Sequence, residues 1–174
     1  MRTPTHPRHR VAPRTIVGAG AASLALLLGA GGPAQAAVSG CRNVRGSYME
    51  HAVSENCLSP VGLCIAGTYS GQIRGDFEGR ATSILTTPDT PTMGVAMFTS
   101  DSTIAATVAG RSGTLIIKNA GAFASTNGGP IVDLQTIVGG TGQLKGASGA
   151  LRAEGTFSAT TGGTSRYQGT LCLP

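Results

Sequence analysis

The sequence has little of what nucleic-acid-binding proteins need. Charged residues make up 12% of its 174 residues, aromatic residues make up 4%, and tryptophan is absent. A nucleic-acid-binding protein is expected to show a basic stripe interleaved with aromatic side chains. Beyond residue 36 the lysines and arginines are instead scattered singly, so nucleic acid is not an expected partner.

Metal ligands at fixed spacings and nucleophile motifs are also missing. The four cysteines include no CxxC pair, and His51 is the one histidine beyond residue 36. Structural zinc sites need such ligands close together in sequence, so we expect neither a metal nor a cofactor. The segment "GASGA" at 146–150 narrowly misses the G-x-S-x-G nucleophile motif, and His51 has no evident serine or cysteine partner.

The most glycine-rich segment, "GGTGQLKGASG" at 139–149, matches no phosphate-binding motif. A dinucleotide fingerprint would need a glycine where Lys145 stands, and a P-loop would need one in place of Leu144, directly before its lysine. The residues that follow alternate between apolar and polar, which favours a strand where both motifs require a helix. We therefore expect the tip of a hairpin.

Residues 1–36 are typical of a secretory signal peptide. Four arginines precede an apolar stretch from residue 15 to about residue 32, and "AQA" at 34–36 ends the segment. The apolar stretch holds five glycines and lacks the roughly 20 strongly apolar residues of a membrane span. We expect cleavage after Ala36 and secretion of a mature protein without a transmembrane span. Its nine basic and eight acidic residues give a net charge of +1.

Beyond residue 62 the sequence has the pattern of an antiparallel sheet. Four units, "GTYSG", "GDFEG", "GAFAS" and "GTFSA", place an aromatic residue two positions after a glycine. Their unequal spacing excludes a solenoid, and no helix-length amphipathic segment interrupts them. Strands are predicted at 63–72, 74–87, 92–100, 102–109, 113–124, 131–139, 148–159 and 165–173. Eight short strands with hairpin-length connections predict an all-β barrel or sandwich at 63–174, preceded by an irregular, disulfide-tied extension at 37–62.

Three segments carry a resemblance to a known superfamily: "GRSGTLIIKNAGAF", "IVGGTGQLKGASGALRAEGTF" and the closing "YQGTLCL". Together they resemble the allene oxide cyclase and dirigent barrel superfamily, and more closely its small bacterial members of unknown function. The resemblance implies an eight-stranded antiparallel β-barrel with an apolar cavity. Members with known activity steer the cyclisation or coupling of small organic molecules. No catalytic residue of those members is found here, so none is carried over.

If the aromatic residue of each strand faces the interior, alternation assigns the rest of that strand. Leu85 is then predicted to face inward. On the strand at 131–139, which has no aromatic residue, Val132, Leu134 and Val138 are also predicted to face inward. The predicted pocket residues are Tyr69, Phe77, Phe98, Leu115, Ile117, Asn119, Phe123, Phe157 and Tyr167. The charges predicted to face solvent are Asp76, Glu78, Arg80, Lys118, Asp133, Arg152, Glu154 and Arg166. Because this arrangement leaves no carboxylate inside, it disfavours a hydrolase that works by acid–base catalysis.

Four cysteines in an exported chain predict two disulfides, with three possible connectivities. Closure of the eight predicted strands would make the first and last neighbours, which favours Cys64 with Cys172 and leaves Cys41 for Cys57. The pairing of Cys57 with Cys64 and of Cys41 with Cys172 would instead show that the extension dictates the connectivity.

Together these features predict a secreted barrel, monomeric or weakly oligomeric, that binds a small apolar or amphipathic molecule inside. Seven aromatic residues and the 22 glycines beyond residue 36 indicate a light core that could leave a cavity. Two alternatives stay open. One is a cyclase or isomerase that steers a small organic substrate by pocket shape, and the other is a structural or interaction protein of the cell envelope with a filled barrel.

Overall fold

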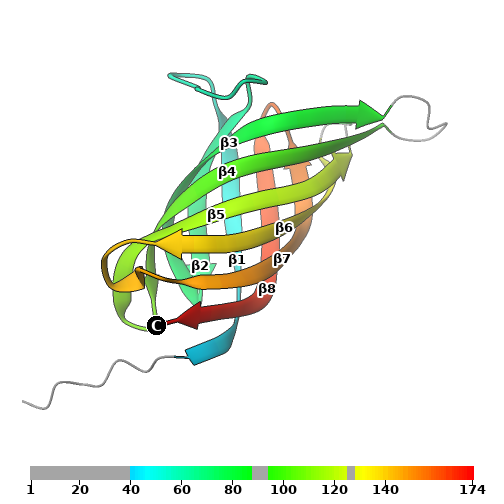
Figure 1. Cartoon of the computed structure of the whole chain (residues 1–174). Coiled ribbons are helices and arrows are strands. Elements are labelled where there is room, and N and C mark those ends of the chain that lie inside the picture. The colour runs from blue at the N-terminus through cyan, green and yellow to red at the C-terminus, as the bar shows by residue number, and fades with distance from the viewer. Residues whose placement is uncertain (1–39, 88–93, 125–127) are drawn as a thin grey trace, which may run out of the picture. The chain divides into compact units, whose positions relative to one another are not determined.

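A closed antiparallel β-barrel accounts for nearly all of residues 40–87, 94–124 and 128–174, which the computed structural model describes (Figure 1). Each strand pairs with its neighbours in sequence, and β1 pairs with β8 to close the sheet. The predicted eight-stranded barrel is thus confirmed. The strands are β1 (Gly40–Val53), β2 (Cys64–Gly71), β3 (Ile73–Thr87), β4 (Val95–Val108), β5 (Arg111–Ala124), β6 (Gly129–Gly140), β7 (Ser148–Ser158) and β8 (Gly162–Leu173), with a short 3-10 helix η1 (Gly142–Leu144) between β6 and β7.

Eight strands were predicted and eight are present, but the predicted and observed strands do not correspond one to one. Residues 40–53, assigned to the irregular extension, form β1, and the strands predicted at 92–100 and 102–109 are one strand, β4. The hydrophobic pattern of β1 is diluted because Gly46 and Glu50 occupy inward positions while Met49 faces solvent. Strand β4 continues through Ser100 and Ser102 because both side chains face inward to other polar groups.

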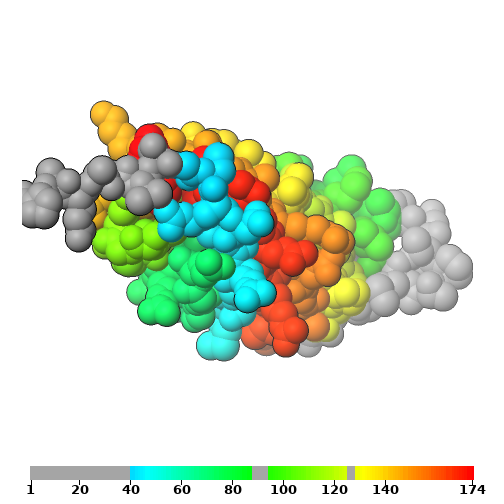
Figure 2. Space-filling view, turned by 90° about the horizontal axis from the view of Figure 1, so that it is seen from below, coloured from blue at the N-terminus to red at the C-terminus, as the bar shows by residue number. Residues whose placement is uncertain are grey.

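The disulfides differ from the favoured pairing. Cys41 is bonded to Cys172, and Cys57 is bonded to Cys64. The argument that the first and last strands are neighbours holds, but the first strand is β1, in which Cys41 lies directly opposite Cys172 of β8. Figure 2 shows β1 in cyan against β8 in red on the outside of the barrel.

Most of the predicted inward residues are buried, with exceptions on β3 and β6. Leu85 is exposed because a bulge between Ala81 and Ser83 reverses the alternation beyond it, so that Ile84 turns inward instead. On β6 the prediction chose the wrong face. The exposed side chains are Val132, Leu134 and Val138, and the inward ones are Ile131, Asp133, Gln135 and Ile137. Both faces of β6 carry apolar residues, so periodicity could not distinguish them; pairing with β5, in which Phe123 lies opposite Ile131, decides the face.

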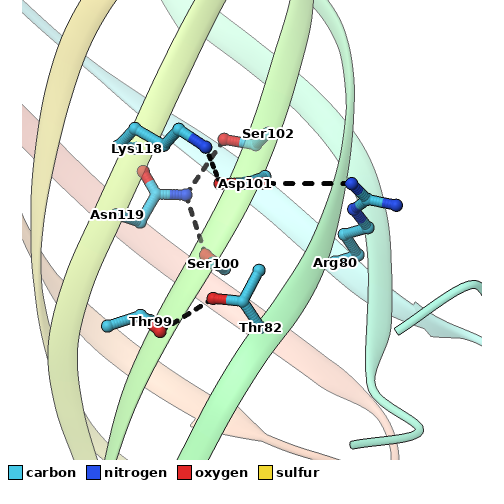
Figure 3. Close-up of polar contacts among 8 residues, drawn as sticks. All are labelled: Arg80, Thr82, Thr99, Ser100, Asp101, Ser102, Lys118 and Asn119. Carbon is cyan, nitrogen blue, oxygen red and sulfur yellow. Dashed lines mark hydrogen bonds and ion pairs between the residues drawn. The ribbon is translucent and has the colours of Figure 1, made fainter. Parts of the chain in front are cut away.

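The predicted outward charges other than Asp133 do face solvent. Asp101 on β4 forms ion pairs with Lys118 on β5 and Arg80 on β3, and Figure 3 shows these contacts across three neighbouring strands. Exposed ion pairs of this kind contribute at most about 1 kcal/mol each, so they do not determine the fold.

The interior of the barrel has three layers along its length. At one end lies an apolar cluster that contains Val44, Ile73, Leu115, Leu171 and, from the segment after β6, Leu144. At the other end lies a smaller cluster of Ala96, Phe123, Ile131 and Phe157. Polar side chains lie between them: each of β4, β5 and β6 passes from one apolar cluster through serine, asparagine, aspartate or glutamine to the other. This order places a polar layer in the middle of the barrel.

The two disulfides are expected to differ in their contribution to stability. Cys41 and Cys172 are separated by 131 residues, and Cys57 and Cys64 by 7. The chain-entropy model assigns about 5 kcal/mol to the longer loop and about 2 kcal/mol to the shorter one. Urea unfolding should therefore show that C41A/C172A lowers the free energy of unfolding more than C57A/C64A does. Equal losses would contradict the entropic account.

Candidate functional site

A cavity lies inside the barrel where the polar layer meets the smaller cluster, which contains Phe123 and Phe157. Its volume, counted as the space open to the centre of a water-sized sphere, is about 40 Å³. One water needs roughly 10–15 Å³ by the same count. Among the predicted pocket residues, the cavity is lined by Tyr69, Phe77, Phe98, Asn119, Phe123 and Phe157. Leu115, Ile117 and Tyr167 belong instead to the large apolar cluster and do not line it. The cavity is therefore narrow, but it has room for more than one water.

Aromatic rings form much of the cavity wall. The rings of Phe123 and Phe157 meet edge to face with their centroids 5.1 Å apart, and Phe98 lies 6.0 Å from Phe123. On the side of β1 and β2, Tyr48 stacks on Tyr69 at 4.8 Å. Such aromatic pairs add attraction beyond the area that they bury. The result is a wall of ring faces and edges suited to a flat apolar group.

Inward-facing glycines make room for these rings. A Cβ at Gly67 would lie 2.0 Å from the Met49 carbonyl oxygen and 2.6 Å from the ring of Phe77. One at Gly121 would lie 2.2 Å from the Val132 carbonyl oxygen and 2.8 Å from the ring of Phe98. Real Cβ atoms do not approach other atoms so closely. The recurrent glycine two positions before an aromatic residue thus has a packing role: at Gly67 and Gly121 it accommodates a ring from a neighbouring strand.

The polar layer contains two hydrogen-bonded groups. The side-chain amide of Asn119 donates to the hydroxyls of Ser100 and Ser102 at 2.9 and 3.0 Å (Figure 3). In the other group the Tyr69 hydroxyl donates to Gln135 Oε1 at 3.0 Å, and Gln135 Nε2 donates to Asp133 Oδ2 at 2.9 Å. Gln135 therefore joins a ring of the aromatic wall to a buried carboxyl group.

Three buried acceptor atoms on residues that line the cavity have no hydrogen-bond partner among the described residues. They are Glu50 Oε1, Asp133 Oδ1 and Asn119 Oδ1. The exposed fraction is 8% for Glu50, 6% for Asp133 and 9% for Asn119. Buried polar groups are nearly always paired, and one left unpaired costs free energy. The three oxygens are therefore acceptors that no described residue satisfies.

Burial shifts the ionisation of both acids toward the neutral form. It raises the pKa of Glu50 to about 7, with a further contribution from the negative charge of Asp133. It also raises the pKa of Asp133 to about 6, although the hydrogen bond from Gln135 acts in the opposite direction. Burial likewise raises the pKa of the Tyr48 and Tyr69 hydroxyls. Near neutral pH the cavity thus holds two carboxyl groups that can gain or lose a proton.

Sequence reasoning missed the residues that give the cavity its chemistry. Tyr48 and Glu50 fell in the supposed extension, and Asp133 and Gln135 were placed on the outer face. The prediction that no carboxylate faces inward is therefore wrong. For Asp133 and Gln135 the sequence held one signal. They share a strand face with Ile131 and Ile137, so the apolar pattern of this strand also permits that face to point inward.

Metal and membrane features are not found in the described residues. No group of three or more histidine, cysteine, aspartate or glutamate side chains is placed there to hold a metal ion. No helix in that part of the chain is long and apolar enough to cross a membrane.

Comparison with known proteins gives a family without an assigned role. The model of a family described as "Protein of unknown function (DUF3224)" matches residues 50–171. No curated protein matches the chain. The solved structure of the pterocarpan synthase dirigent protein PsPTS1 aligns at 14% identity over 76% of this chain and 95% of that one, with a TM-score of 0.30. That likeness is too weak to support an inference about function.

The buried acids should make the protein less stable as the pH rises. The folded protein holds the protons of Glu50 and Asp133 more tightly than the unfolded chain, so the free energy of unfolding is highest below their ordinary pKa values of 4.5 and 3.8 and falls as the pH approaches about 7. At about 1.4 kcal/mol per pKa unit, Glu50 alone accounts for roughly 3 kcal/mol. Urea unfolding between pH 4.5 and 7.5 should show a flatter profile for E50Q. The exposed control E154Q should keep the wild-type slope, and a wild-type slope in E50Q would refute the assignment.

Proposed function

The chain belongs to the family of proteins of unknown function DUF3224, and we propose that it is an exported barrel that binds a small amphipathic molecule in its interior cavity. The observation that carries the proposal is the presence of three buried, unpartnered acceptor atoms on described residues that line a cavity with aromatic walls. Ligand sites combine a mainly apolar lining with a few convergent polar groups. The two disulfides and the signal-like segment at 1–36 support export to an oxidising compartment.

The loop between β1 and β2 supplies an apolar rim to the cavity. Leu63 lines the cavity, and its carbonyl accepts a hydrogen bond from the Ala81 amide at 2.9 Å. The Ser59 hydroxyl donates to the Ala81 carbonyl at 2.7 Å, and the Cys57–Cys64 disulfide closes the loop. These contacts hold Leu63 in place, so the rim is fixed by covalent and hydrogen bonds as well as by packing.

The principal alternative is a structural protein whose barrel is filled by its own side chains. The apolar end supports it, since Ile73, Ile104, Leu115 and Leu171 are fully buried there. The middle layer does not, because a filled structural core has no need for unpaired carboxyl oxygens. Small-molecule binding accounts for both the packed end and the polar cavity.

A cavity-filling substitution tests ligand binding. Ala81 lines the cavity and is 5% exposed, so A81L should fill space that a ligand needs. The control is A105L, which adds the same side chain on the outer face of β4. Native mass spectrometry of protein from its host's culture medium should show a reproducible small-molecule adduct in the wild type and A105L, and none in A81L. N-terminal sequencing of the same sample should begin near Ala37.

Ligand-free spectra from all three proteins would favour the structural role. Circular dichroism of A81L distinguishes a blocked cavity from a failure to fold, because overpacking costs about 1–3 kcal/mol and should leave the β spectrum intact.

One observation favours a second candidate function, isomerisation or cyclisation of a bound substrate. Glu50 and Asp133 have pKa values raised to about 7 and about 6, and carboxyl groups tuned to such values serve as general acids and bases. In this reaction a carboxylate takes a proton from a substrate carbon, and the resulting carboxylic acid returns a proton to another carbon. The substrate is rearranged without an oxidant or a reductant.

Solvent isotope exchange distinguishes catalysis from binding. A compound recovered from the purified protein is incubated with wild-type protein in D₂O and analysed by mass spectrometry. A catalyst that works by proton transfer should introduce deuterium at carbon or convert the compound to an isomer, and E50Q should slow this by about 100-fold or more. If the compound returns unchanged and unlabelled, the protein is a binder and the enzymatic role is excluded for that compound.

A further inference from the structure

Among the described residues, two acids and no base line the cavity. Glu50 of β1 and Asp133 of β6 both line it. In the part of the chain that the structure describes, no lysine or arginine is buried and none lines the cavity, and His51 is exposed. Buried charges are normally paired with an opposite charge or bound to a metal. Here the protein supplies neither partner among its described residues.

The unpartnered atoms on the cavity-lining residues also share one chemical character. Glu50 Oε1, Asp133 Oδ1 and Asn119 Oδ1 are all acceptors, and the amide nitrogen of Asn119 is already used by two serine hydroxyls. Oxygens of this kind can be satisfied by a group that donates hydrogen bonds. A primary ammonium group carries three N–H donors and one positive charge. It therefore matches both the number of open acceptors and the charge that the cavity lacks.

From this arrangement we infer that the ligand is a small amphipathic amine, whose ammonium group is bound by Glu50 and Asp133 and whose flat apolar part lies against the aromatic wall. The inference rests on the proposed function and specifies its ligand class. Asn119 Oδ1 provides a third acceptor. An anionic ligand is repelled by both acids, and a neutral ligand leaves them without a counter-charge.

Binding of a cation should be coupled to release of protons from the cavity. The titratable side chains that face the polar layer are Tyr48 and Glu50 from β1, Tyr69 from β2 and Asp133 from β6. The lining residues contributed by β3, β4, β5 and β7 are phenylalanine, alanine, serine and asparagine, and none of these side chains ionises. Both tyrosines stay neutral because burial raises the pKa of each. The two acids therefore control the pH dependence, and an ammonium group should bind more tightly as they ionise.

A matched series of four probes tests the inference with the full-length protein. Benzylamine, benzyl alcohol, toluene and benzoate share one ring and differ in charge and hydrogen-bonding capacity. Binding is followed by two-dimensional ¹H–¹⁵N NMR, which detects weak ligands and shows whether the amides of Glu50, Asn119 and Asp133 respond. Affinity at pH 7.5 should decrease in the order benzylamine, benzyl alcohol, toluene, benzoate. Between pH 5.5 and 7.5 benzylamine affinity should rise by about tenfold, as expected when a carboxyl group ionises within that range.

The variant E50Q/D133N removes both negative charges and keeps two amide oxygens. Benzylamine affinity should fall by about tenfold or more and lose its pH dependence, whereas benzyl alcohol affinity should change by less than about threefold. The control E78Q/E154Q neutralises two exposed acids on the outer face and should bind benzylamine like the wild type. Because the cavity variant removes buried charges, it is expected to fold, and its NMR spectrum verifies this directly.

Two results would overturn the inference in distinguishable ways. If toluene and benzyl alcohol bind in the cavity as tightly as benzylamine, or more tightly, the barrel is a ligand-binding protein without preference for amines, and the proposed function survives. If none of the four probes shifts the cavity amides, the binding function fails together with the inference. A pH-independent affinity for benzylamine, unchanged in E50Q/D133N, would exclude the two acids as the cation site.

Discussion

The pairing of β1 with β8 is the constraint on which the rest of the structure depends. It closes the sheet and removes the two edges that an open sheet would expose. Tyr167 of β8 strengthens the closure from inside, since its hydroxyl accepts a hydrogen bond from the Ile73 amide at 2.9 Å and lies 3.2 Å from the Ser70 carbonyl. A Cβ on Gly46 would lie 2.5 Å from that hydroxyl, so glycine there allows the contact. The Cys41–Cys172 disulfide fixes the same pair of strands on the outside.

Closure also determines what the cavity contains. Strand β1 contributes Tyr48 and Glu50 to the interior, and Glu50 lies opposite Gly67 of β2 and Gly163 of β8. With no side chain from either glycine beside it, the carboxyl group can occupy the middle of the barrel. The acid from β1 comes close enough to Asp133 of β6 for the charge of Asp133 to raise the pKa of Glu50. Without β1 the barrel would contain a single acid and no coupled pair.

The polar layer reduces stability, and the apolar layers on either side offset that cost. Two carboxyl groups with unpartnered oxygens are unfavourable in a buried site, whereas the large cluster at the apolar end buries many aliphatic side chains at 2% exposure or less. The exposed Val132, Leu134 and Val138 on β6 show how strongly register determines this arrangement. In that strand three apolar residues face solvent while Asp133 and Gln135 lie inside. Exchanging the two faces of the strand would remove Ile131 and Ile137 from the two apolar clusters.

The sequence by itself determined the fold class and much of the aromatic interior. Alternation, turn residues and the glycine–aromatic units predicted an all-β barrel or sandwich, and the superfamily resemblance favoured the barrel. The pattern also correctly oriented Tyr69, Phe77, Phe123 and Phe157, because a strand with one clearly apolar face can be assigned by its period alone. Periodicity had no such power in β1, whose inward positions include Gly46 and Glu50, or in β6, which is apolar on both faces. There the inward face was decided only by pairing with neighbouring strands, a contact between residues far apart in sequence. The cysteine pairing and the two cavity acids depend on β1 and β6, so only the tertiary structure could reveal them.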